Sequence, residues 1–186
     1  VYVRLGSSNR QADRELIGEL RRSAEGVAFD EMPMPALTMD DLNLTEIQAA
    51  FGARRKIDEK SLTTLKLLRH DQGRCVPSIG GILLFGRERT SYFPDAWVQC
   101  GRFQGVDKAV IFDHIEIDQP LPIALESIML FLQKHAMRGA DFSQLHRKDV
   151  WSIPLVILRE AVINALVHAD YSQRGAPIRI SFFDDR

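Results

Sequence analysis

The segment Arg159–Tyr171 reads REAVINALVHADY, and it places a few polar side chains in a run that is otherwise apolar. Side chains four positions apart lie on one face of an α-helix, because the helix turns once in about 3.6 residues. Glu160, Asn164 and His168 follow this spacing. The sequence therefore predicts a mostly buried helix over about residues 153–167, with the three polar groups in one stripe.

The residues on either side of this helix predict where it begins and what it packs against. Proline is well tolerated in a first helical turn, where the backbone amide has no helical partner. We therefore expect Pro154 in the first turn. Downstream, Ile178–Phe183 reads IRISFF and alternates in the manner of a β-strand. The helix is expected to pack on a sheet that contains this strand.

The polar stripe has two interpretations on the residues alone. A Glu-x-x-x-Asn pair on a helix is most often the side that faces solvent. A buried carboxylate and amide, in contrast, each need a partner, because burying them unpaired is unfavourable. A metal ion with phosphates, or an ordered water, would supply that partner.

The wider segment carries a resemblance. Residues 160–172, EAVINALVHADYS, resemble the N-box helix of the ATPase superfamily that includes DNA gyrase, the mismatch-repair ATPases and the sensor histidine kinases. The form Glu-Ala-x-x-Asn-Ala-x-x-His-x-Asp-Tyr is most similar to RecG-related, Schlafen/AlbA-type DNA-binding transcriptional regulators. The resemblance implies that Asn164 binds the Mg²⁺ that bridges the phosphates of ATP and that Glu160 is the catalytic base. His168 and Asp170 belong to the same motif and are expected to contact the nucleotide.

The chemistry of these residue types agrees with that implication. Mg²⁺ prefers a few hard oxygen ligands together with water and phosphate oxygens. An amide oxygen one helical turn from a carboxylate can provide both a ligand and a base. Ala169 departs from the commoner family pattern, which has Arg at this place, and so removes a cation that could face phosphate.

Both ends of the chain suggest a longer protein. The first residue is not Met, and residues 1–8, VYVRLGSS, resemble the last strand and turn of a Schlafen/AlbA-type DNA-binding domain. The chain stops directly after the strand-like Ile178–Phe183. In the resembled family, the following strand leads to a glycine-rich segment that closes over the nucleotide. We therefore expect this chain to hold part of one site.

The expected fold class is α+β, with mixed, largely antiparallel sheets and packed helices. The resemblance implies that it ends in the start of a histidine-kinase/gyrase-like ATPase α/β sandwich. Residues 1–28 are expected to be the tail of an upstream DNA-binding domain, 29–145 a central α+β domain and 146–186 the N-terminal part of the ATPase-like domain. Pro33 and Pro35 favour a boundary near residue 29, because they forbid a continuous helix there.

Local patterns predict the remaining elements. Asn43 followed three residues later by Glu46 is typical of a helix N-terminus. The expected helices are residues 13–22, 44–51, 61–70 and one that opens at 118–122 and runs to about 135. The expected strands are residues 79–85, 97–103 and 109–117.

One motif imitates a phosphate-binding loop. Residues 81–88, GILLFGRE, nearly match the pattern G-x-x-x-x-G-K-[ST]. Arg87 and Glu88 replace the lysine and the hydroxyl that would hold phosphate and Mg²⁺. The four residues between the glycines resemble a buried strand. We therefore exclude a phosphate loop, and with it a helicase motor of the usual kind.

Composition indicates an ordinary globular chain. The 186 residues are 45% hydrophobic and carry a net charge of −1, which gives no electrostatic footprint for nucleic acid. DNA is therefore expected to bind through the upstream domain. No run approaches the roughly 18 apolar residues of a membrane span. Cys75 and Cys100 form no C-x-x-C pair, which speaks against structural zinc and suits a cytoplasmic protein.

Three functions remain open at this stage. The first is a DNA-binding transcriptional regulator in which bound ATP alters the engagement of DNA, with homo-oligomerisation left open. The second is a nucleotide-free module for protein interaction or dimerisation. The third is an ATP-hydrolysing enzyme related to helicases. We rank them in this order, because family membership alone does not establish ATP binding.

Overall fold

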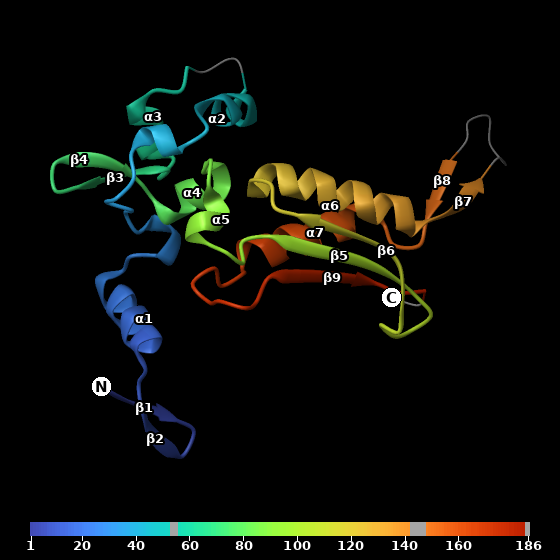
Figure 1. The fold of residues 1–186 in the computed structure, drawn as a ribbon, viewed down its shortest axis with the longest axis horizontal. Coiled ribbons are helices and arrows are strands. Elements are labelled where there is room, and N and C mark those ends of the chain that lie inside the picture. The colour runs from blue at the N-terminus through green and yellow to red at the C-terminus, as the bar shows by residue number, and fades with distance from the viewer. Residues whose placement is uncertain (53–55, 142–147, 185–186) are drawn as a thin grey trace. The chain divides into compact units, whose positions relative to one another are not determined.

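The structure is a computed structural model that describes residues 1–52, 56–141 and 148–184 (Figure 1). The chain divides into two compact units, Val1–Ile82 and Leu83–Arg186. Helices combine with small antiparallel and mixed sheets, so the α+β class is confirmed. The three-part division expected from the sequence stays a prediction. Within the described residues, no helix has the length and apolar character needed to cross a bilayer.

The first unit begins with a hairpin and a helix. Strands β1 (Tyr2–Leu5) and β2 (Ser8–Gln11) pair antiparallel. Helix α1 (Arg14–Glu25) starts where Asp13 accepts a hydrogen bond from a first-turn amide, and it ends at Gly26, whose φ of 66° is left-handed. The predicted helix is confirmed and extends three residues further.

The middle of the first unit contains short helical elements. The 3₁₀ turns are Phe29–Glu31 and Met39–Asp41. Helix α2 (Leu44–Phe51) begins as predicted, because the Asn43 side chain accepts from the amide of Glu46 at 3.4 Å. This hydrogen bond satisfies one of the amides that a helix N-terminus leaves free.

The predicted helix over residues 61–70 is wrong in its second half. Helix α3 (Glu59–Thr64) ends before Lys66, which adopts a positive φ of 60°. The chain then enters strand β3 (Leu68–Asp71), which pairs antiparallel with β4 (Arg74–Pro77). The hairpin satisfies the backbone of these residues across strands, so the leucine spacing that suggests a longer helix is overridden.

The predicted strand over residues 79–85 is also wrong, because this segment is helix α4 (Ile79–Phe85). Ser78 is buried, and its hydroxyl accepts from the amide of Gly81 at 2.9 Å, as a helix cap does. A Cβ at Gly81 would collide with the carbonyl of Leu67, so only glycine permits this packing. The four residues between Gly81 and Gly86 thus belong to a helix and not to the predicted strand. In either case they do not form a phosphate-binding loop.

The second unit is built on a three-stranded sheet in the order β6-β5-β9. After the short helix α5 (Arg89–Tyr92), β5 (Val98–Gln104) pairs antiparallel with β6 (Val110–Ile117). Strand β9 (Ile178–Phe182) pairs with β5 in parallel. All three strands are confirmed to within one residue.

The helices of the second unit are α6 (Leu121–Ala136) and α7 (Leu155–Val167). Between them, β7 (Met137–Asp141) and β8 (Lys148–Trp151) pair antiparallel. Pro154 is the residue that caps α7, adjacent to the first turn expected for it. The start and end of α6 agree with the sequence prediction.

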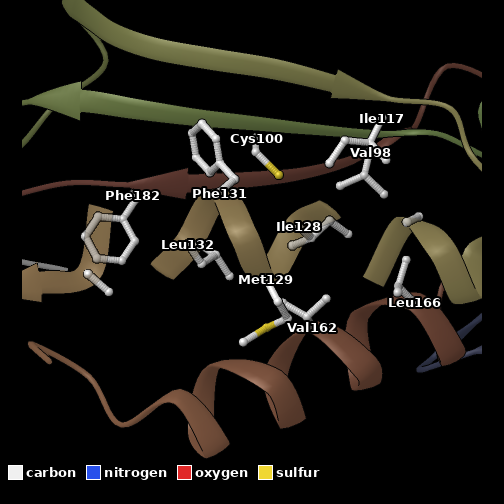
Figure 2. Packing of buried hydrophobic residues seen from close by; sticks show 12 residues of the cluster. Val98, Cys100, Ile117, Ile128, Met129, Phe131, Leu132, Val162, Leu166 and Phe182 are labelled. Atoms are coloured by element: carbon white, nitrogen blue, oxygen red, sulfur yellow. The ribbon is translucent and has the colours of Figure 1, made fainter. Parts of the chain in front are cut away.

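The core of the second unit joins both helices to one face of the sheet, and Figure 2 shows the helices on the same side of the strands. Phe131 and Ile128 of α6 point toward β5, whereas Met129 lies beside Val162 of α7. Leu166 completes the contribution of α7 to this cluster. The core therefore fixes which face of α7 is left for other contacts.

Candidate functional site

Helix α7 presents its polar stripe to solvent. The side chains of Glu160, Asn164 and His168 are all exposed. The Nδ2 atom of Asn164 donates to Oε1 of Glu160 at 3.5 Å, which confirms that the two residues share a face. His168 is the C-cap of α7, and its amide donates to the carbonyl of Asn164 at 3.0 Å.

The expectation that α7 is mostly buried is wrong. Only Val162 and Leu166 of this helix are fully buried, because α7 meets the core along one narrow face. Val156 is 73% exposed, Ile157 56% and Val167 68%. The high apolar content of the segment therefore does not place it inside the described fold. Since the polar stripe is also exposed, no desolvation cost obliges it to hold a ligand.

Asp170 lies in a tight turn directly after α7. Its carboxylate accepts from the amide of Ser172 at 3.0 Å, from the hydroxyl of Ser172 at 2.5 Å and from Nε2 of Gln173 at 2.9 Å. Such an Asx-type turn fixes the backbone that leaves the helix. The structure thus gives Asp170 a local role, and its contact with a nucleotide stays a prediction.

Two residues to which the sequence assigned no role lie close to this turn. The hydroxyl of Tyr171 donates to the carbonyl of Leu166 at 2.7 Å. Burial raises the pKa of Tyr171 to about 12, and the charge of Arg89 opposes that rise. Arg89 is 3% exposed and donates to the carbonyls of Asp118, at 2.8 Å, and Gln119. A single arginine at the start of a short helix carries no sequence signal for this role.

The pKa of Tyr171 predicts a loss of stability in alkali. An unfolded tyrosine ionises near pH 10, whereas the folded residue ionises at about 12. The stabilisation is therefore complete below about pH 10 and is lost as the pH rises toward about 12, because the unfolded state loses its proton first. We expect the urea midpoint to fall over this range and to fall less steeply in Tyr171→Phe.

The same variant reports on the hydrogen bond of Tyr171 to Leu166. Tyr171→Phe should lower the free energy of unfolding near neutral pH by about 0.5–1.5 kcal/mol. Cys100, whose pKa burial raises to about 11, contributes to the alkaline loss in both proteins. The difference between the two urea curves therefore isolates Tyr171. Identical alkaline slopes would show that Tyr171 ionises as freely in the folded chain as in the unfolded one.

Comparisons with known proteins establish the fold and no more. No family model and no curated protein matches the chain. The chain is similar to the crystal structure of the DIP2311 protein from Corynebacterium diphtheriae, with a TM-score of 0.60 and 22% sequence identity. The likeness covers 99% of this chain but only 36% of that protein. At this identity the result shows a shared fold, and the chain spans about a third of its neighbour.

Proposed function

We propose that this chain is part of a cytoplasmic, DNA-binding transcriptional regulator of the RecG-related, Schlafen/AlbA type, in which ATP binding is coupled to DNA binding. The observation that carries the proposal is the exposed face of α7. Glu160 and Asn164 are in contact there, one turn apart, in the order of the resembled ATPase motif. In the same proposal, residues 146–186 are the start of a histidine-kinase/gyrase-like sandwich.

The donor groups on α7 fit an ATP-bound Mg²⁺. Asn164 uses its Nδ2 for Glu160, so its amide oxygen remains as a hard ligand. Mg²⁺ is commonly held by one or two protein oxygens and completed by phosphates and water. Bound there, the ion would supply positive charge that stabilises the phosphates of ATP. Glu160 is the group that would orient or deprotonate water, His168 lies at the C-terminal end of the same helix, and Asp170 lies in the turn that follows.

DNA contact is assigned to a part of the protein outside this chain. The net charge of −1 offers no electrostatic footprint for a phosphate backbone. An upstream DNA-binding domain would supply it, and ATP on α7 would change how that domain engages DNA. A homodimer would be compatible with a regulator of this kind. The contacts among the described residues do not require a second copy of the chain.

A second function is favoured by a specific observation. Val156, Ile157 and Val167 are more than half exposed on one helix of the unit. Exposed aliphatic side chains gathered on one element often mark an interface. A nucleotide-free interaction module would cover them with protein and would leave Glu160 and Asn164 at its polar edge. A dedicated ATPase ranks third, because α7 alone offers few groups for catalysis.

Calorimetric titration of ATP into the full-length protein tests the proposal. We expect saturable binding in the presence of Mg²⁺ and a loss of roughly tenfold or more in affinity when the ion is chelated, since the ion carries the phosphate contacts. The affinity for DNA should change when Mg²⁺ and ATP are present together. Absence of binding at about 1 mM ATP would refute the proposal and favour the interaction module.

A further inference from the structure

The sheet of the second unit has a second face that the α7 site does not use. Side chains alternate along a strand, so residues that neighbour the core positions point to the opposite face. Two rows on that face follow from the strand register. Glu116, Gln99 and Arg179 form the first row, and His114, Gly101 and Ser181 form the second.

A hollow of about 470 Å³ lies on this face. Its lining includes both rows together with Phe103, Lys108 and Ile111. The volume falls within the range of roughly 300–1,000 Å³ that is typical of small-molecule pockets. Gly101 lies on β5 between the two flanking strands and is buried, because the ring of Phe103 leans against it. A Cβ at Gly101 would lie 2.9 Å from the ring of Phe103, so the absence of a side chain at Gly101 makes room for that ring at one end of the hollow.

The charges around the hollow favour an anion. Among the described residues, Arg179 forms no ion pair, and Lys108 has only the ring of Phe103, 5.9 Å from its Nζ, as a partner. Glu116 accepts from Nε2 of Gln99 at 3.5 Å. Glu116 and Arg179 belong to the two outer strands, which are about 9.6 Å apart at about 4.8 Å per strand, and no ion pair joins them in the described residues.

The apolar part of the hollow favours a flat group. The ring of Phe103 stacks on Phe183 with centroids 5.2 Å apart, which holds it rigidly beside Gly101. Ile111 lies opposite Phe103 on β6. From the Gly101 row to the Arg179 row is about 6.6 Å, two residues along a strand. A single aromatic ring at the edge of the Phe103 ring, between the Gly101 row and the Arg179 row, would therefore place an attached carboxylate beside Arg179.

We propose that this hollow binds a small aromatic carboxylate, with the ring against the edge of Phe103 and the carboxylate on Arg179. His114 and Ser181 flank the ring and supply further polar contacts, and Lys108 adds a second cation. This site is independent of α7, so it stands or falls separately from ATP binding.

Titration of the chain with benzoate, followed by ¹H–¹⁵N NMR, tests the site. We expect saturable shifts confined to the amides of residues 99–103, 111–116 and 179–181, with a dissociation constant of roughly 1 mM or tighter. Benzamide has the same ring without the charge and should bind roughly tenfold more weakly or worse. No saturation at about 10 mM benzoate, or equal binding of benzamide, overturns the proposal.

Two variants locate the anion contact. Arg179→Gln removes the charge and should weaken benzoate binding roughly tenfold or more, because a charge-assisted contact is lost. Arg174→Gln makes the same change at an exposed position outside the hollow and should leave the affinity unchanged. Both side chains are exposed, so both variants should retain the wild-type spectrum. Equal affinities for the two variants would place the carboxylate elsewhere and refute the assignment to Arg179.

Discussion

Replacement of Leu132 by alanine is expected to lower the free energy of unfolding of the second unit by about 2–5 kcal/mol. Leu132 is 2% exposed and belongs to the cluster that joins α6, α7 and the sheet. Truncation removes buried methyl groups and leaves a cavity that a close-packed core cannot fill by relaxing. Typical domains are stable by about 5–15 kcal/mol, so this loss is a large fraction of the total.

Leu130 provides the matched control for this measurement. It lies on the same helix but is 67% exposed, so Leu130→Ala makes the same chemical change without a cavity. We expect its free energy of unfolding to stay within about 0.5 kcal/mol of the wild type. Urea unfolding followed by circular dichroism compares the three proteins. Equal midpoints for both variants would contradict the assignment of the α6 face that meets the core.

The elements that the sequence predicted well have strong local signals. Helix α2 begins at an Asn43 cap that the spacing of Asn43 and Glu46 indicates, and the cap is present. Helix α6 combines an apolar face with prolines at its start, and its bounds were predicted to within a few residues. In both cases the information lies within one or two turns of the chain, so no knowledge of distant contacts is needed.

The elements that the sequence predicted wrongly depend on distant contacts. Residues 79–85 form a short apolar run, and such a run does not distinguish a buried strand from a buried helix. The helix is selected by the Ser78 cap and by the approach of Gly81 to Leu67, which lies far along the chain. Likewise, residues 68–71 form a strand and not the predicted helix, because they pair with the strand at 74–77.

The sequence predicted which residues of the candidate site share a helix face, but it did not predict whether that face is buried or exposed. Helical periodicity placed Glu160 and Asn164 on one face, and the contact at 3.5 Å confirms it. Periodicity could not reveal which face meets the core, because α7 is apolar on nearly every side. The use of Asp170 in a turn and the hydrogen bond of Tyr171 to the helix depend on the path of the chain after α7. A sequence pattern does not contain that path.

The second large effect is expected in the full-length protein and concerns Glu160. If Glu160 is the base of the proposed ATP site, Glu160→Gln should lower any ATP hydrolysis by roughly 10²-fold or more, the usual scale for loss of a general base. Binding of ATP with Mg²⁺ should remain nearly intact, because the amide keeps the size and polarity of the side chain. The measurement pairs a steady-state phosphate-release assay with calorimetry on the same protein.

Asn164 separates the two roles on this face. Asn164→Ala removes the proposed metal ligand, so it should abolish the Mg²⁺-dependent part of ATP binding and any effect of ATP on DNA affinity. The side chains of Glu160 and Asn164 are both exposed, and substitutions at exposed positions usually change the free energy of unfolding by no more than about 0.5 kcal/mol. Each variant should therefore fold, so a functional loss can be assigned to chemistry. Unfolding of both the Glu160→Gln and the Asn164→Ala protein would instead show that the two side chains stabilise the fold.

Glu126→Gln controls for the loss of a carboxylate. Glu126 is exposed on α6 of the same unit, and its side chain is not part of the α7 face. The Glu126→Gln protein should bind and hydrolyse ATP as the wild type does. An equal fall in rate for Glu126→Gln and Glu160→Gln would show a general effect of charge, not a base. If Glu160→Gln and Asn164→Ala both bind and hydrolyse ATP like the wild type, the polar stripe on α7 is only a solvent-facing surface. The exposed side chains of Val156, Ile157 and Val167 would then favour a protein partner on this helix.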